Sequence, residues 1–339
     1  MNPPTSAAAA PTTSKWNALA DRVLAGQAIE PDEARSILDA PDVELLDLLA
    51  AAYRIRHHHY GNKVKLNYLV NAKSGLCPED CTYCSQSKDS TAEIHQYRLM
   101  SQEQIVEKAD HAAKMHAGTC CIVISAKGPS DREVDHVAGA IQEIRQRHPD
   151  MKLCACLGIL KDGQAERLAD AGADRYNHNL NTAETHYEDI CSTHSYADRL
   201  ATVESSKKAG ISPCSGVIIG MGETRDQVVE SSYALRDLDV DSIPVNFLIA
   251  IEGTPLAEQP LEPLDPRYCL KVLCMYRFVN PTKELRVSAG REVHLRHMQP
   301  MALYAANAMF LADYLTEPGQ APDLDEQMVE DLGFEWETP

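Results

Sequence analysis

Three cysteines stand close together in the first third of the chain. Cys77, Cys81 and Cys84 have the spacing Cys-x3-Cys-x2-Cys. Zinc sites in proteins usually take four ligands in two separated pairs. Three thiolates on one tight loop instead suit a [4Fe–4S] cluster in which the protein holds three of the irons. The triplet therefore predicts an iron–sulfur cluster whose fourth iron is free to bind another molecule.

Further cysteines lie in short apolar runs of the kind that form strands. They are Cys120, Cys121, Cys154, Cys156 and Cys214. A single cysteine in such a run usually behaves as a small buried hydrophobic residue. Cys154 and Cys156 are two residues apart and face the same side of a strand, whereas Cys120 and Cys121 face opposite sides. In one barrel, inward-facing cysteines from these strands can share a layer, and Arg291, after a late strand, could join them.

Alternating strand and helix patterns position these residues. Short apolar runs predict strands at 64–70, 119–125, 152–157, 175–180, 213–219, 242–249 and 285–288, and a weaker one at 308–312. Helical spacing occurs at 101–117, 131–147, 162–171, 196–209, 225–238 and 266–279. This alternation favours parallel strands in an α/β fold. We expect a closed (β/α)8 TIM-type barrel, with an open doubly wound sheet as the alternative, and the chemistry at the carboxyl ends of the strands.

The two ends of the chain differ in composition from its centre. Residues 1–14 are rich in Pro, Ala, Thr and Ser, and they lack the charged start of a secretory signal and the arginines of a transit peptide. They are predicted to be a disordered tail. Residues 15–60 are predicted to form a short helical N-terminal extension, residues 61–315 the barrel, and residues 316–339 an acidic, loosely attached tail.

The composition excludes several classes of protein. The chain has 339 residues, of which 44% are hydrophobic and 24% charged, as in ordinary globular proteins. No apolar run approaches the ~18 residues that a membrane helix needs. A formal net charge of −18 repels phosphate backbones, so nucleic acid is not an expected partner. Eleven cysteines without a secretory signal predict free thiols in the cytoplasm.

The cysteine triplet after the first strand resembles the signature of the radical S-adenosylmethionine (SAM) superfamily. Tyr83 fills the aromatic position before the last cysteine of that motif. In the superfamily the open iron binds the amino and carboxylate groups of SAM. An electron from the cluster then splits SAM into methionine and a 5′-deoxyadenosyl radical. The resemblance implies a [4Fe–4S] cluster and SAM as cofactors.

A longer set of matches, from about residue 67 to residue 308, resembles the biotin synthase family. The matching segments are Tyr176-Asn177-His178-Asn179-Leu180, Cys214-Ser215-Gly216, Gly220-Met221-Gly222-Glu223, Pro244-Val245-Asn246-Phe247-Leu248, Gly253-Thr254-Pro255-Leu256 and Ser288-Ala289-Gly290-Arg291-Glu292. The resemblance implies that Cys121, Cys154, Cys214 and Arg291 hold an auxiliary [2Fe–2S] cluster. Cys120 and Cys156 depart from the family pattern, and either could displace an expected ligand.

Polar residues near the ends of the central strands are candidates for binding small molecules. Asn177 and Asn179 are two residues apart and face one side, and an amide can pair with a ureido ring or with ribose hydroxyls. The resemblance implies that Asn179 and Asn246 bind the ureido group of dethiobiotin. It also implies SAM contacts from Tyr83, Asn181, Arg199, Gly220 and Gly222. Asn181 stands where the family often carries an aspartate.

The activity implied by the resemblance is that of a sulfurtransferase, the insertion of sulfur into dethiobiotin to make biotin. The auxiliary cluster would donate the sulfur. The resemblance also implies a low-potential electron donor, flavodoxin or ferredoxin, and a homodimer. One alternative is another radical SAM enzyme of the same barrel type, such as a hydrogenase-maturation or methylornithine-forming relative, which would not need the barrel cysteines. Another is an iron–sulfur scaffold or zinc protein that binds metal without cleaving SAM.

Overall fold

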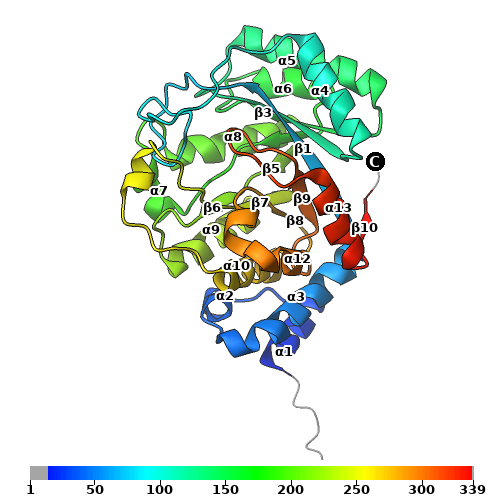
Figure 1. Ribbon diagram of the computed structural model, residues 1–339, viewed down its shortest axis with the longest axis vertical. Coiled ribbons are helices and arrows are strands. Elements are labelled where there is room, and N and C mark those ends of the chain that lie inside the picture. The colour runs from blue at the N-terminus through cyan, green and yellow to red at the C-terminus, as the bar shows by residue number, and fades with distance from the viewer. Residues whose placement is uncertain (1–13, 338–339) are drawn as a thin grey trace, which may run out of the picture.

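A closed ring of parallel strands forms the centre of the molecule. The structure is a computed structural model, and it describes residues 14–337 (Figure 1). Around the ring the strands follow the order β1-β2-β3-β4-β5-β7-β8-β9, and β9 pairs with β1 to close it. Their bounds are β1 (Lys63–Lys73), β2 (Thr119–Ile124), β3 (Lys152–Cys156), β4 (Arg175–Asn177), β5 (Ser212–Cys214), β7 (Ser242–Phe247), β8 (Glu284–Val287) and β9 (Ala308–Leu311). The predicted (β/α)8 barrel is confirmed, and the open sheet is wrong.

Several of the barrel strands are short and buried on both faces, as expected for parallel strands covered by helices, and β2, β8 and β9 are buried along their whole length. The run predicted as one strand at 213–219 is broken, because β5 ends at Cys214 and β6 (Val217–Ile219) pairs separately with β7. At the break, a Cβ on Gly216 would lie 1.9 Å from the Pro244 carbonyl oxygen. The close approach of the two backbones therefore requires a glycine here.

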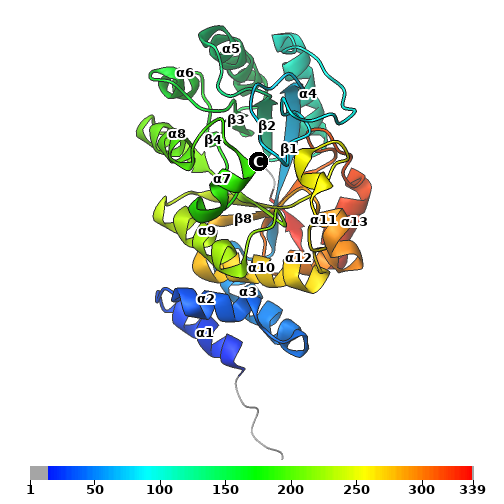
Figure 2. The same cartoon turned by 90° about the vertical axis from the view of Figure 1, so that its left-hand side faces the viewer.

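Helices surround the ring of strands, as Figure 2 shows. The larger ones are α4 (Gln102–Lys114), α5 (Asp131–Arg147), α6 (Gln164–Asp170), α8 (Tyr196–Lys208), α9 (Arg225–Asp237) and α10 (Pro266–Val279). Capping boxes begin α4, α5, α8 and α9 at Ser101, Ser130, Ser195 and Thr224. In each box the hydroxyl accepts a hydrogen bond from a backbone N–H that the helix leaves unpaired. None of the helices among residues 14–337 is long and apolar enough to cross a membrane.

Three N-terminal helices form a layer beside α10 (Figures 1 and 2). They are α1 (Lys15–Leu24), α2 (Pro31–Leu38) and α3 (Leu45–Tyr60). Ser14 caps α1, and the rest of the predicted disordered tail lies outside the described residues. The guanidinium of Arg56, on α3, is buried and donates to the carbonyl oxygens of Lys63 and Ala306 at 2.7 and 3.3 Å. These bonds attach the helical layer to the segments that lead into β1 and β9.

The C-terminal segment differs from the loosely attached tail that its acidic composition suggests. Residues 322–331 form the helix α13 (Pro322–Asp331), and β10 (Glu335–Trp336) pairs with the start of β1. Asp325 of α13 is fully buried and bound to Arg291, while Val329 and Phe334 are buried in the apolar core. The ion pair, the buried apolar residues and the pairing of β10 with β1 together dock this acidic segment on the barrel.

Candidate active site

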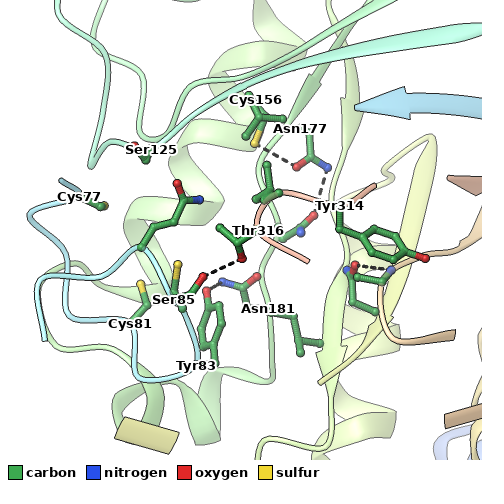
Figure 3. Close-up of a pocket in the computed structure, with 18 of the residues that line it drawn as sticks. Cys77, Cys81, Tyr83, Ser85, Ser125, Cys156, Asn177, Asn181, Tyr314 and Thr316 are labelled. Carbon is green, nitrogen blue, oxygen red and sulfur yellow. Dashed lines mark hydrogen bonds between the residues drawn. The ribbon is translucent and has the colours of Figure 1, made fainter. Parts of the chain in front are cut away.

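A cavity of about 380 Å³ opens at the carboxyl ends of the barrel strands. Its wall contains Cys77, Cys81 and Cys84 from the loop after β1, Cys121 from β2 and Cys156 from β3. Figure 3 labels Cys77, Cys81 and Cys156 among them. Loops after the other strands add to the wall, among them the loop after β4 and the loop after β9, the latter through Tyr314 and Thr316. The structure therefore joins the loop cysteines and the barrel cysteines in one site.

The loop that carries the cysteine triplet is folded by its own hydrogen bonds and by neighbouring loops. Gly75 and Leu76 have positive φ angles of 73° and 56°, which turn the chain sharply after β1. The Gly75 carbonyl accepts from the Ser125 hydroxyl at 2.6 Å, and its N–H donates to Gln86 at 2.9 Å. The cysteines are free thiols. Burial raises the pKa of Cys84 to about 11, so iron binding at neutral pH must displace a proton from this thiol.

The barrel cysteines lie next to one another around the inner wall. Cys121 on β2 pairs in register with Cys154 on β3, and Asn177 on β4 pairs with Cys214 on β5. Cys121, Cys154 and Cys214 are buried, and Cys121 and Cys154 form a small apolar cluster with Phe310. Three thiols converge here without a disulfide. They are soft donors in a closed site, which is the donor set that an iron–sulfur cluster takes.

The arginine beside these cysteines is Arg286, on β8, which sequence reasoning missed. It lines the cavity, it is buried, and its guanidinium lies close enough to the Cys121 and Cys214 thiols for them to affect its pKa. Its Nη2 donates to Ser242 Oγ and Glu284 Oε1 at 3.1 and 2.8 Å, but its buried Nε has no hydrogen-bond partner. A buried donor without a partner fits a bound group that the cavity is built to hold. The sequence offered one signal for this role, namely an arginine placed within an otherwise apolar predicted strand.

The expectation that Arg291 joins the barrel cysteines is wrong. Strand β8 ends at Val287, and Arg291 is the first residue of α11 (Arg291–Leu295). The Arg291 guanidinium is buried against α13, where its Nη2 donates to both carboxylate oxygens of Asp325 at 2.8 and 2.9 Å. Its Nη1 donates to Gln299 at 2.7 Å. Arg291 therefore attaches the C-terminal helix and does not line the cavity.

The two cysteines that depart from the family pattern have different surroundings. Cys120 is buried in the main core, on the opposite side of β2 from Cys121, and does not line the cavity. Cys156 lines the cavity, and its thiol donates to Asn177 Oδ1 at 3.4 Å (Figure 3). Cys156 is thus the only one of the two departures that can reach a bound group.

An amide network connects β4 to the barrel cysteines. Asn177 Nδ2 donates to Cys214 Sγ and to Asn179 Oδ1, both at 3.1 Å. Asn179 Oδ1 also accepts from the Gly216 N–H at 3.0 Å, which leaves its Nδ2 to bind another molecule. Asn246 Nδ2 donates to the Val217 carbonyl at 3.0 Å and retains a second N–H. Asn177, Asn179 and Asn246 all line the cavity.

Asn181 and Arg199 also reach the cavity. Asn181 has a positive φ of 72°, and its amide donates to the Tyr83 hydroxyl. Arg199 is buried, not a solvated residue on a helix face, and its Nη1 donates to the Asn179 carbonyl at 2.8 Å. Figure 3 shows Tyr83 and Asn181 together beside the cysteine loop. The side chains of Asn181 and Arg199 are thus held in fixed positions near the triplet.

Gly220 and Gly222 do not line the cavity, contrary to their predicted role in approaching SAM. Their φ angles are 102° and 100°, in the region that favours glycine. The Gly220 N–H donates to Glu223 at 2.7 Å, and a Cβ on Gly220 would lie 2.9 Å from a Leu264 methyl group. The geometry of the turn before α9 explains these glycines.

A buried carboxylate balances the positive charge in the barrel. Glu284 on β8 is within 3.1 Å of Arg175, Arg286 and Lys65. Burial opposes its ionisation, but the guanidinium groups of Arg175 and Arg286 outweigh burial and hold the pKa of Glu284 well below its ordinary value. The barrel interior therefore contains one fixed anion, the buried Arg286 and the partly buried Arg175 beside three thiols.

Beside the cysteine loop, Cys81 contacts Cys191, which in turn contacts His194, and sequence reasoning assigned neither residue to the site. The Cys81 thiol donates to Cys191 Sγ at 3.6 Å, and Cys191 Sγ lies 3.3 Å from His194 Nδ1. In the cluster-free chain this bond raises the pKa of Cys81 and lowers the pKa of Cys191. Sequence spacing gave no signal for it, because 110 residues separate the two cysteines.

Comparison with known proteins identifies the family. The model of the radical SAM superfamily matches residues 73–232, and that of the Biotin and Thiamin Synthesis associated domain matches residues 244–335. The chain is 57% identical to the biotin synthase of Geobacillus kaustophilus (strain HTA426), over 96% of each chain. It is 55% identical to that of Bacillus subtilis (strain 168), again over 96% of each.

Solved structures with much lower sequence identity share the fold. Methylornithine synthase superposes with a TM-score of 0.80 at 19% identity, covering 94% of this chain and 97% of its own. The FeFe-hydrogenase maturase HydG from Carboxydothermus hydrogenoformans gives 0.80 at 16% identity, covering 96% and 79%. These likenesses establish the barrel architecture. The high identity to curated relatives along nearly the whole chain shows more, namely that this chain belongs to the biotin synthase family.

Proposed function

We propose that this chain converts dethiobiotin to biotin by inserting a sulfur atom, in the cavity described above. One observation carries the proposal: a single cavity is lined by the SAM-type cysteine triplet and by Cys121 and Arg286 of the barrel. A substrate in it can contact groups bound at both places. As a radical SAM enzyme the chain uses a [4Fe–4S] cluster and SAM.

The triplet Cys77, Cys81 and Cys84 would hold the [4Fe–4S] cluster. When bound, the cluster supplies the electron that cleaves SAM to methionine and a 5′-deoxyadenosyl radical. Arg199 supports a SAM site because its buried, fixed guanidinium suits a carboxylate. The Asn181 amide and the Tyr83 hydroxyl provide polar contacts beside it. These residues orient the cofactor and exclude water from the radical.

An auxiliary [2Fe–2S] cluster would be held by Cys121, Cys154, Cys214 and Arg286, and would supply the sulfur. The place of Arg286 on the cavity wall, with its Nε unpartnered, supports this assignment, whereas Arg291, whose Nε is also unpartnered, does not line the cavity. Arg286 and Arg175 also offset the negative charge of buried thiolates, which an apolar site without cations would disfavour. The Asn177 amide donates to Cys214 Sγ and so fixes the orientation of this ligand.

Dethiobiotin would lie between the two sites. Its ureido group needs donors and acceptors, and Asn179 and Asn246 supply amides with unused hydrogen-bonding capacity. The methyl carbon next to the ring would lose a hydrogen atom to the radical, and sulfur from the auxiliary site would bond to that carbon. A second SAM would allow the ring to close. The cavity of about 380 Å³ is within the ordinary range for small-molecule sites.

The family resemblance further supports a low-potential donor such as flavodoxin or ferredoxin, a homodimer, and a cytoplasmic location. Reduction of the reconstituted protein by each purified donor tests the choice of electron donor. Sedimentation of the reconstituted protein tests the homodimer.

The defining experiment is an anaerobic reaction with iron- and sulfide-reconstituted protein, SAM, dithionite and dethiobiotin, analysed by mass spectrometry. The proposal predicts biotin and 5′-deoxyadenosine together. Deoxyadenosine without biotin, from protein in which Mössbauer spectra verify both clusters, would refute the substrate. A Cys274→Ala variant is the matched control, because Cys274 is a buried cysteine on α10 that does not line the cavity.

A further inference from the structure

A second cavity, of about 370 Å³, adjoins the active-site cavity and has no part in the proposed reaction. Leu69 and residues 314–317 line both cavities, so the loop after β9 is a partition between them. The exposed residues His95, Lys108 and Asp313 also line the second cavity, which is therefore open to solvent. The partition stands between this solvent and the inner wall of the barrel.

Tyr314 is the residue of the partition that packs against the barrel cysteines. It belongs to the same buried apolar cluster as Cys121, Cys154 and Phe310, and only 9% of its surface is exposed. Figure 3 shows Tyr314 on the wall of the active-site cavity. Because packed interiors leave few voids larger than a water molecule, the tyrosine ring excludes water from this side of the two thiols. Tyr314 therefore closes the partition at the barrel cysteines.

Glu292, on α11, holds the Tyr314 side chain in this position. The Tyr314 hydroxyl donates to the carboxylate of Glu292, whose two oxygens lie 2.9 and 3.1 Å away. Glu292 Oε1 also accepts from the backbone N–H of Gln320 at 3.1 Å. One carboxylate thus binds the loop on both sides of the partition.

Other hydrogen bonds attach the middle of the partition without involving the Tyr314 side chain. Asn71 Nδ2 donates to the Leu315 carbonyl oxygen at 2.7 Å. The hydroxyl groups of Ser85 and Thr316 lie 2.9 Å apart, and Figure 3 marks this bond as a dashed line. A substitution can therefore release the tyrosine ring while the rest of the loop stays attached.

We propose that Tyr314 is a positioning residue which, held by Glu292, separates the barrel cysteines from the second cavity and protects the sulfur-donating site from solvent and small solutes. The inference rests on the proposed function, in which Cys121 and Cys154 hold the auxiliary cluster. A sulfur atom that must bond to a substrate carbon has to be kept from competing reactions. Exclusion of water is how a closed site prevents them.

The test is the rate at which N-ethylmaleimide labels each cysteine of the cluster-free full-length chain, measured by mass spectrometry. The variants are Tyr314→Phe, which keeps the ring but loses the hydroxyl, Tyr314→Ala, which removes the ring, and Glu292→Ala, which removes the acceptor. Loss of a hydrogen bond to a charged group should shift the local opening equilibrium, and hence the labelling of Cys121, by roughly tenfold in Tyr314→Phe and Glu292→Ala. Tyr314→Ala should label Cys121 faster still.

Two other cysteines of the same chain are internal references. Cys156 lines the active-site cavity but lies outside the Tyr314 cluster, so its labelling reports entry through the cavity mouth. Cys274 is buried on α10, and its labelling reports global unfolding. Both should keep their wild-type rates. Tyr68→Ala is the matched control variant, because Tyr68 lines the second cavity but not the first, and it should leave Cys121 labelling unchanged.

The reconstituted holoenzyme gives a second readout. An iron chelator should remove the auxiliary cluster faster from Tyr314→Ala than from wild type, with the [4Fe–4S] cluster lost at the same rate in both, as followed by Mössbauer spectra. Equal loss of the auxiliary cluster would overturn the inference. So would wild-type labelling of Cys121 in Tyr314→Ala, or a rise that Cys156 or Cys274 matches. Failure of the proposed function is distinct, because wild type itself would then hold no auxiliary cluster while the labelling of the cluster-free chain stayed as predicted.

Discussion

Replacement of Arg291 by methionine should destabilise the protein and leave both clusters in place. Arg291 binds Asp325 through two hydrogen bonds of 2.8 and 2.9 Å, and neither residue is more than 1% exposed. The variant leaves a buried carboxylate without its cation, which costs about 3–5 kcal/mol. Gln320 still donates to Asp325 at 2.7 Å, so we expect the lower end of this range, with Tm falling by roughly 6 °C.

The cost of Arg291→Met should depend on pH in a defined direction. Burial raises the pKa of Asp325 to about 6, although Arg291 acts to lower it. Without Arg291 this pKa rises further above the unfolded value of ~3.9. A carboxyl group with a raised folded-state pKa stabilises the protein below its unfolded pKa and loses that contribution as pH rises through the folded pKa. The difference from wild type should therefore be small at pH 5 and largest above pH 7.

Thermal melts across this pH range, together with iron analysis, check the prediction. Arg291→Met/Asp325→Leu is the matched control, because removing both charges should restore most of the lost stability. Arg286→Met should instead deplete auxiliary iron and spare the [4Fe–4S] signal. The reasoning is refuted if Arg291→Met loses auxiliary iron at unchanged stability, since Arg291 and not Arg286 would then belong to the cluster site.

Three further variants test separate parts of the site. Cys77→Ala should abolish the [4Fe–4S] EPR signal and 5′-deoxyadenosine formation; SAM cleavage at the wild-type rate would exclude Cys77 as a ligand. Cys154→Ala should retain some deoxyadenosine formation but no biotin, and biotin formed at the wild-type rate would exclude the auxiliary assignment. Glu284→Gln should cost about 3–5 kcal/mol in the cluster-free protein, since it leaves the buried Arg286 and the partly buried Arg175 without their anion. Denaturant titration at neutral pH measures this loss, and an unchanged midpoint would contradict it.

The barrel was predictable because several of its strands are buried on both faces and therefore read as short apolar runs. The division of 213–219 into β5 and β6 was not, because it depends on how closely Gly216 approaches Pro244 of another strand. The docking of α13 was also not predictable. Its acidic sequence is typical of a solvated tail, and the pairing of Asp325 with Arg291 depends on the fold.

The site was predictable where its residues are close in sequence or follow a family motif. The cysteine triplet lies on one loop, and alternation along β2 separates Cys121 from Cys120. The arginine was misassigned because two arginines stand five residues apart, and only the end of β8 at Val287 shows which of them faces the barrel interior. Cys191 could not be found, because its contact with Cys81 joins two loops that only the fold brings together.

The most direct test of the central claim follows the sulfur atom from the auxiliary site into the product. The chain is reconstituted with 34S-labelled sulfide, freed of unbound sulfide, and given SAM, reductant and dethiobiotin for a single turnover. The account predicts that the biotin formed carries 34S and that auxiliary cluster is lost in proportion. Unlabelled biotin, or labelled biotin formed equally well by Cys154→Ala, would contradict it.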